Sequence, residues 1–241
     1  MMPVLDLSLP SFTSFADRHG YTLQVSHVSA DDADRWSATA KRVRWEKVSI
    51  IQSTLEQSDV VVWLDADVLL CRTDTDILDS LGAYDYQGLV LHSVPFENRI
   101  TPNTGVWVIR NTEKSFRFLD RVSEIGMPEG RWADQGAVLR ALEWILGDEH
   151  YHGARMSDTP NQFMKGTAWL PLGWNLPYCG NRTDEVEYAG RPAVANPFAI
   201  HFSRMPIPDR VKYMREIVDH PSPQPIMQTG GNRVTSTTAW L

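Results

Sequence analysis

The sequence predicts an α/β fold with a mostly parallel, Rossmann-like sheet in a single domain, and two observations lead to this prediction. Strand-like apolar runs alternate with segments of helical periodicity through most of the 241 residues, a pattern typical of parallel strands joined by helices. The run Val60–Leu64 is apolar at every position, as expected for a central strand covered on both faces. We expect the domain to span residues 1–220. Residues 221–241 contain few apolar side chains, so we expect a mobile tail there.

Local patterns predict the individual elements. A helix is predicted over Trp36–Gln57, because apolar side chains recur there at every third or fourth position. Asn111-Thr112 can cap the next helix, and Ala133–Leu146 is predicted as a further helix. The other predicted elements are strands at Tyr21–Ser26, Asp59–Leu64, Gly88–Leu91, Val106–Ile109 and Ala199–Phe202, a helix at Asp209–Asp219, and a small irregular insertion with short strands over Pro160–Pro197.

Composition restricts the partners and the location. The net charge of −7 repels phosphate backbones, so nucleic acid is not expected as a partner. A phosphate-bearing substrate would therefore need local help from a cation. The sequence contains two cysteines and neither a signal peptide nor an apolar run of transmembrane length. We therefore expect no transmembrane segment and a cytoplasmic location.

Two carboxylates, Asp65 and Asp67, directly follow the most apolar strand. The carboxyl end of a central parallel strand lies at the crevice where α/β folds bind ligands. Carboxylate oxygens together with diphosphate oxygens suit Mn²⁺ or Mg²⁺. In a loop, one carboxylate can bind a ribose while the other binds the metal. The motif thus predicts a metal site for a phosphate-bearing ligand.

The same segment also fits the haloacid-dehalogenase-like phosphatases, in which the first Asp, here Asp65, is the nucleophile. That chemistry needs a second acidic pair at a strand end to hold Mg²⁺. The best pair in this chain, Asp148-Glu149, follows a predicted helix, and 64 residues precede Asp65. A nucleophile strand of that class usually opens the domain, so the phosphatase is kept as the alternative.

Six ordered blocks of sequence carry a resemblance to a known family. They are Arg42–Lys47, Val62–Asp67, Asn103–Asn111, Trp132–Gln135, Trp174-Asn175 and Ile200–Phe202. In these blocks the chain resembles glycosyltransferase family 34, the fungal and plant α-galactosyl-, α-mannosyl- and α-xylosyltransferases. The resemblance implies a GT-A fold, Mn²⁺, and a nucleotide-diphosphate sugar (UDP- or GDP-sugar) as the donor. It also implies transfer to a hydroxyl acceptor, unknown here, with retention of the anomeric configuration.

The resemblance further implies roles for individual residues. Asp65 and Asp67 match the metal motif, where Asp65 also contacts the donor, and His201 matches the third metal ligand near the C-terminus. Asp134 and Gln135 match positions that line the donor sugar and its reacting face. Because Gln135 is a weak nucleophile, it fits a mechanism in which the acceptor attacks from the side of the leaving group.

Three further residues are predicted to contact the donor. Asn103 is expected to hydrogen-bond the donor sugar, and Gly105 is expected to let the ligand approach the backbone closely. Where relatives often have His-Phe-x-Gly, this chain has Arg204 in place of the glycine, and a guanidinium can bind a phosphate.

Two further departures from the family concern location and activity. The Golgi members have an N-terminal membrane anchor that this sequence does not show, so we expect a cytosolic enzyme of bacterial type. The family also begins with a strand that contacts the nucleotide base. Met1–Leu7 leaves little room for such a strand. A catalytically inactive sugar-binding relative that keeps the fold is therefore a further alternative. A nucleotidyltransferase is disfavoured, because the sequence has no Gly-rich, basic strand–loop near its N-terminus.

Overall fold

The computed structural model describes residues 2–26, 38–94, 98–128, 132–148, 150–178, 196–203, 205–220 and 235–240. Its strands are β1 (Tyr21–Ser26), β2 (Val60–Asp65), β3 (Val68–Leu70), β4 (Gln87–Val94), β5 (Arg99–Arg110), β6 (Thr167–Leu170), β7 (Leu176–Pro177), β8 (Ala199–His201) and β9 (Thr235–Trp240). Its helices are α1 (Met2–His19), α2 (Ala38–Leu55), α3 (Ile77–Leu81), α4 (Glu113–Ile125), α5 (Ala133–Ala141), α6 (Gln162–Lys165), the 3₁₀ turn η2 (Leu172–Trp174) and α7 (Ile207–Asp219).

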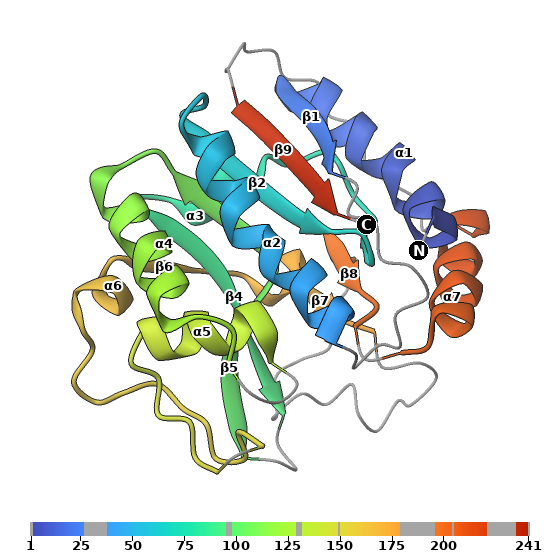
Figure 1. The fold of residues 1–241 in the computed structure, drawn as a ribbon. Helices are drawn as coiled ribbons and strands as arrows, with labels where there is room; N and C mark the ends of the chain where they lie inside the picture. Colours follow the sequence, from blue (N-terminus) through green and yellow to red (C-terminus); the bar gives the residue numbers. More distant parts are fainter. Residues whose placement is uncertain are drawn as a thin grey trace.

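A six-stranded sheet in the order β1-β9-β2-β5-β4-β6 forms the centre of the molecule (Figure 1). Only β5 runs opposite to the other strands of this sheet. A smaller sheet in the order β3-β8-β7 continues from the turn after β2. The predicted α/β fold with a mostly parallel sheet is therefore confirmed.

Strand β2 is covered on both faces, as its apolar sequence predicts. Val61 and Trp63 are buried in one core cluster with side chains of α2, α4 and α5. Val62 and Leu64 point to the opposite face and pack with side chains of α1 and α3. Since alternate residues of a strand face opposite sides, a strand between two helical layers needs an apolar residue at every position.

The turn that follows β2 is held by two other elements. The backbone N–H of Phe202 donates to the carbonyl of Asp67 at 2.9 Å, which ties the end of β8 to this turn. The buried hydroxyl of Ser8 in α1 donates to the carbonyl of Ala66 at 2.9 Å. These contacts place His201, the last residue of β8, beside Asp67.

Strand β5 contains an irregularity next to the same turn. The pairing of β4 with β5 passes from Leu89 opposite Trp107 to Val90 opposite Asn103, so it skips residues 104–106. Such a bulge bends the strand and redirects its side chains, and bulges are frequent beside active sites. The sequence Asn103-Thr104-Gly105 is therefore a bulge inside a strand rather than a turn before one.

Among the described helices of eight or more residues, two differ markedly from the sequence prediction. The helix predicted over Ala133–Leu146 ends at Ala141, since Glu143 adopts a positive φ of 54° that cannot continue a helix. Helix α1 was not predicted, because Pro10 interrupts its pattern. Its buried side chains, among them Phe12 and Phe15, nevertheless recur at helical spacing.

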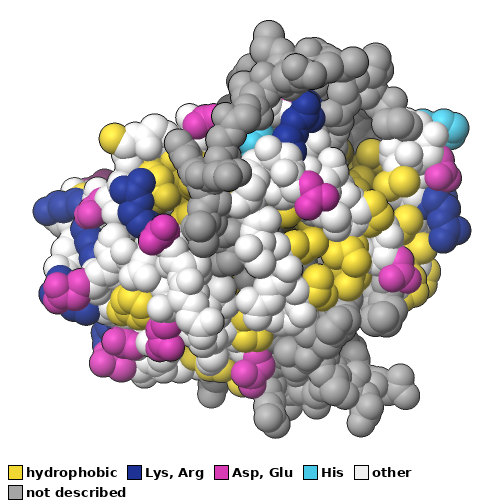
Figure 2. Space-filling view, turned by 90° about the horizontal axis from the view of Figure 1, so that it is seen from above, with side chains coloured by type: hydrophobic (Ala, Val, Ile, Leu, Met, Phe, Trp, Pro, Cys, Tyr) yellow, Lys and Arg dark blue, Asp and Glu magenta, His cyan; other side chains and the backbone are white. Residues whose placement is uncertain are grey.

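Among the described residues, no helix is both long and apolar enough to cross a membrane. Figure 2 shows acidic and basic side chains interspersed on the face that it presents.

The last part of the chain also differs from the prediction. A mobile tail was expected over residues 221–241, but residues 235–240 form β9, which pairs in parallel with β1 on one side and β2 on the other. Residues 221–234 lie outside the described part of the chain. The segment Thr235–Trp240 is rich in threonine, a β-branched residue that favours strands, and backbone pairing on both sides adds to this preference.

We predict that Thr237→Pro destabilises the protein markedly. Residue 237 lies opposite Leu23 of β1 and Val62 of β2, and proline is not tolerated within a strand that is paired on both sides. The free energy of unfolding, measured by urea titration, should fall by about 1–3 kcal/mol, the cost of a buried group without its hydrogen bond. Thr237→Val is the matched control, because it keeps the N–H and the side-chain shape. Equal stability of the two variants would show that the segment is not in the sheet.

Candidate active site

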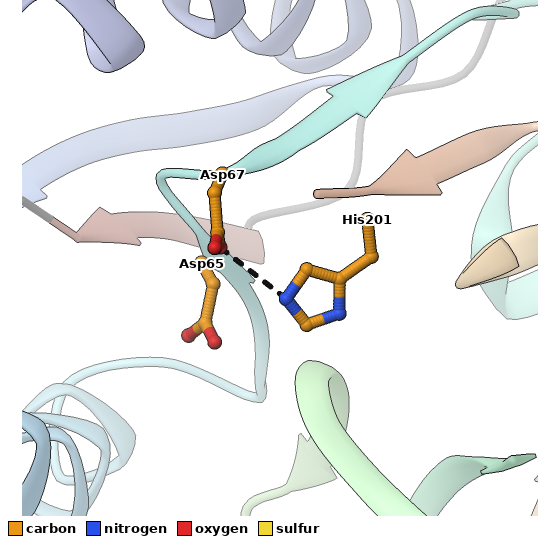
Figure 3. Close-up of side chains that lie close together, drawn as sticks. All are labelled: Asp65, Asp67 and His201. Carbon is orange, nitrogen blue, oxygen red and sulfur yellow. Dashed lines mark ion pairs between the residues drawn. The ribbon is translucent and has the colours of Figure 1, made fainter. Parts of the chain in front are cut away.

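The three residues predicted to bind a metal come together at the end of β2 (Figure 3). Asp65 is the last residue of β2, Asp67 lies in the turn before β3, and His201 ends β8. One ligand atom from each lies within 4.8 Å of the other two. His201 is buried, and its Nε2 lies 3.3 Å from Oδ1 of Asp67.

This arrangement fits a divalent cation. Oxygen ligands lie about 2.0–2.1 Å from Mg²⁺, so atoms on opposite sides of one ion are about 4.2 Å apart. The three ligand atoms are at most 4.8 Å apart, so shifts of about half an ångström would bring them within reach of one ion. Two carboxylates and one imidazole suit Mn²⁺ as well as Mg²⁺, although Mg²⁺ prefers oxygen ligands alone.

Arg210 of α7 is part of this cluster. Its guanidinium lies 2.8 Å from Oδ2 of Asp67, and its Nε donates to the carbonyl of Met205 at 3.0 Å. Burial opposes ionisation of Asp67, but the neighbouring positive charge of Arg210 favours it, and the pKa of Asp67 is held far below its usual value. Asp67 therefore carries its negative charge into the site.

A second cation, Lys47 of α2, lies between Asp65 of β2 and Asp134 of α5. Its Nζ lies 2.8 Å from Oδ1 of Asp65 and 3.1 Å from Oδ2 of Asp134, and it donates to the carbonyl of Thr104 at 3.2 Å. Burial lowers the pKa of Lys47, but the charges of Asp134 and Asp65 reverse this, so the pKa is raised. The indole N–H of Trp63 also donates to Asp65, at 2.7 Å.

The β5 bulge supplies the floor of the site. A Cβ added to Gly105 would lie 2.7 Å from Nδ1 of His201, closer than real contacts allow, so this glycine makes room for the imidazole. Asn103 accepts from the N–H of Gly105 at 2.9 Å and from the amide of Asn175 at 2.8 Å. The Asn103 oxygen is thus held by the protein, and its amide group faces Gln135 at 3.4 Å.

Two of the other predicted site residues, Asp134 and Gln135, lie at the start of α5. They are on the far side of Lys47 from Asp65. Asp134 is buried and accepts from the hydroxyl of Thr104 at 2.7 Å, whereas Gln135 is partly exposed. Their roles toward a donor sugar stay predictions. Arg204 lies outside the described residues.

Sequence reasoning assigned no role to Lys47, Arg210 or Asn175. Lys47 lies four residues before the buried Ile51 and eight before the buried Leu55, so it is on the apolar face of its helix. A lysine at such a position could have indicated a buried ion pair. Lys47 and Asn175 also stand in blocks that carry the family resemblance. Arg210 has no local signal, because its partner Asp67 is far away in the sequence.

Comparison with known proteins agrees with this architecture. Residues 4–163 match the nucleotide-diphospho-sugar transferase family. In Oryza sativa subsp. indica, "Probable glycosyltransferase 7" is 30% identical over 103 residues and "Probable glycosyltransferase 3" is 34% identical over 106 residues. These stretches cover 39% and 40% of this chain but only 23% and 22% of those relatives, so the chain spans less than a quarter of their length.

A solved structure extends the likeness over most of the chain. A glycosyltransferase involved in the glycosylation of the major capsid of PBCV-1 is similar with a TM-score of 0.56 and 14% identity, over 88% of this chain and 92% of that one. The expected GT-A type of fold is therefore confirmed.

We predict that Lys47→Met destabilises the folded protein. The change leaves Asp134 and Asp65 facing each other without the cation between them, and removing one partner of a buried ion pair costs about 3 kcal/mol or more. Chemical denaturation measures the loss.

Two controls separate charge from packing. Lys165→Met alters an exposed lysine of α6 and should change the free energy of unfolding by less than about 0.5 kcal/mol. Adding Asp134→Asn to Lys47→Met removes one of the two facing charges and should recover part of the lost stability. If the double variant is no more stable than Lys47→Met alone, the ion pair does not account for the effect.

Proposed function

This chain belongs to the nucleotide-diphospho-sugar transferase family, and on that premise we propose that it is a metal-dependent glycosyltransferase. It moves a hexose or pentose from a UDP- or GDP-sugar to an acceptor hydroxyl, with retention of the anomeric configuration as in glycosyltransferase family 34. The observation that carries the proposal is the convergence of Asp65, Asp67 and His201 at the carboxyl end of β2.

The charges of the site support a diphosphate as the ligand. Three carboxylates, Asp65, Asp67 and Asp134, face two cations, Lys47 and Arg210, which leaves one excess negative charge when His201 is neutral. A divalent cation held by Asp65, Asp67 and His201 would supply positive charge for binding the diphosphate and stabilising it as a leaving group. With that ion the cluster would carry one net positive charge, which would attract a diphosphate instead of repelling it.

The remaining residues act on the sugar side. In this reaction the bond between the anomeric carbon and the diphosphate oxygen breaks, and the bond from the acceptor oxygen to that carbon forms. The acceptor proton passes to the departing diphosphate oxygen, so no side chain is needed as a base. Gln135, partly exposed at the start of α5, presents a neutral polar group to the reacting carbon. Asp134 lies behind it and fixes the start of α5 through its ion pair with Lys47.

The phosphatase alternative has no such support. Asp148, the residue needed for a second acidic pair, accepts from the backbone N–H groups of His150 and His152 at 2.8 Å and 2.9 Å in an exposed turn. These bonds account for its place as a turn residue. A phosphoenzyme trapped on Asp65 would restore that alternative.

We predict that turnover of the nucleotide-sugar requires the metal site. Asp67→Asn should abolish transfer and donor hydrolysis, because it removes the charge of one ligand, and EDTA should abolish the activity of the unchanged protein. A radiolabelled panel of UDP- and GDP-sugars with added Mn²⁺ measures both effects. Asp17→Asn, at an exposed position of α1, serves as the control. Full activity in EDTA contradicts metal dependence, and a panel without turnover points to the inactive sugar-binding relative.

A second prediction concerns Gln135. If this side chain faces the reacting carbon, Gln135→Ala should lower kcat by about 100-fold, the size of one lost transition-state contact. Binding of the nucleoside diphosphate, which lacks the sugar, should stay the same within a factor of about two. Single-turnover kinetics and calorimetry separate the two quantities. A loss of nucleotide affinity with unchanged kcat would place Gln135 on the nucleotide side instead.

A further inference from the structure

A chain of side-chain amides connects Gln135 with the imidazole of His201. The amide nitrogen of Asn103 donates to Gln135 at 3.4 Å, and that of Asn175 donates to Asn103 at 2.8 Å. The oxygen of Asn175 lies 2.9 Å from Nδ1 of His201. Asn175 and His201 are both buried, so the bond between them is shielded from water.

Two backbone groups fix the direction of every bond in this chain. The carbonyl of Pro102 can only accept, so Gln135 turns its amide nitrogen toward it, at 2.8 Å, and its oxygen toward Asn103. The N–H of Gly105 can only donate, so Asn103 turns its oxygen toward it, at 2.9 Å. Asn175 must then donate to that same oxygen.

The consequence falls on His201. Because Asn175 donates through its nitrogen to Asn103, only its oxygen is left for the imidazole. Nδ1 of His201 must therefore carry a proton, and in the neutral ring the lone pair lies on Nε2. Nε2 faces Oδ1 of Asp67 at 3.3 Å. Both of these atoms then present a lone pair to the space between them, and a cation bound there would attract both.

We propose that Asn175 is a positioning residue that selects the Nδ1–H tautomer of His201 and so presents Nε2 to the divalent cation. The inference rests on the metal site of the proposed function and deepens it. Hydrogen bonds from a metal-binding histidine to a second residue fix its tautomer and orientation, and their loss typically weakens metal binding by 10- to 100-fold.

The backbone of Asn175 supports this role. Its N–H donates to the carbonyl of Leu172 at 3.0 Å, and its own carbonyl lies 2.7 Å from Nε2 of His92. The residue is thereby fixed between η2 and β7 independently of its side chain. A change confined to the side-chain amide therefore tests the tautomer without removing these anchors.

Three variants separate the hydrogen bond to His201 from packing. Asn175→Leu keeps the side-chain volume approximately and removes the acceptor. Asn175→Asp restores an oxygen that accepts from Nδ1–H. Asn103→Asp is the control for the tautomer, because its carboxylate accepts from the same two N–H groups of Gly105 and Asn175. It removes the donor to Gln135 and adds a negative charge, but it leaves the contact between Asn175 and His201 in place.

Long-range ¹H–¹⁵N NMR reports the tautomer, with the His201 signals assigned from the spectrum of His201→Gln. It is recorded for the metal-free protein with the ring neutral and again with Mg²⁺, which is diamagnetic. The unchanged protein and Asn103→Asp should show a protonated Nδ1 and an unprotonated Nε2. Calorimetric titration with Mn²⁺ should give about 10- to 100-fold weaker binding for Asn175→Leu, with recovery in Asn175→Asp.

The outcomes distinguish the inference from the proposed function. If the metal-free, unchanged protein has its proton on Nε2 and still binds Mn²⁺, the role of Asn175 is overturned and the metal site stands. Unaltered tautomer and affinity in Asn175→Leu would overturn it too. If the unchanged protein does not bind Mn²⁺, the proposed function fails and the inference fails with it. Should Asn175→Leu not fold, the spectrum of the unchanged protein still decides.

Discussion

The concentration of negative charge at the end of β2 is the constraint on which the rest of the site depends. Three carboxylates approach one another where the protein excludes most water, and like charges at such a place repel strongly. Lys47 and Arg210 offset two of these charges from opposite sides. Helices α2 and α7 thus each bring one cation to the cluster, and the remaining negative charge is left for a divalent cation in the proposed function.

The position of this cluster follows from pairings that the sequence only partly reveals. The apolar run before Asp65 predicts a central strand and places Asp65 at its carboxyl end. His201 arrives beside Asp67 because β8 pairs with β3 and because Phe202 donates to the Asp67 carbonyl. A three-residue strand far along the chain gives little periodic signal, so the resemblance to a known family, not the local pattern, supplied this ligand.

Other parts of the fold could not be predicted for identifiable reasons. Helix α1 contains Pro10, and proline inside a helix is locally unfavourable. The burial of Phe12 and Phe15 favours the helix nevertheless. Strand β9 has few apolar residues and depends on backbone pairing with β1 and β2. Buried cations such as Lys47 are missed because lysine is normally exposed.

Pulsed electron paramagnetic resonance of bound Mn²⁺ tests the central claim most directly, because it detects the nuclei next to the ion. With UDP or GDP present, the unchanged protein is predicted to show a ¹⁴N coupling from His201 and a ³¹P coupling from the diphosphate. His201→Gln is predicted to lose the ¹⁴N coupling and to bind Mn²⁺ about 10-fold or more weakly. A ¹⁴N coupling and an affinity that remain unchanged in that variant, or the absence of ³¹P coupling, would contradict the account.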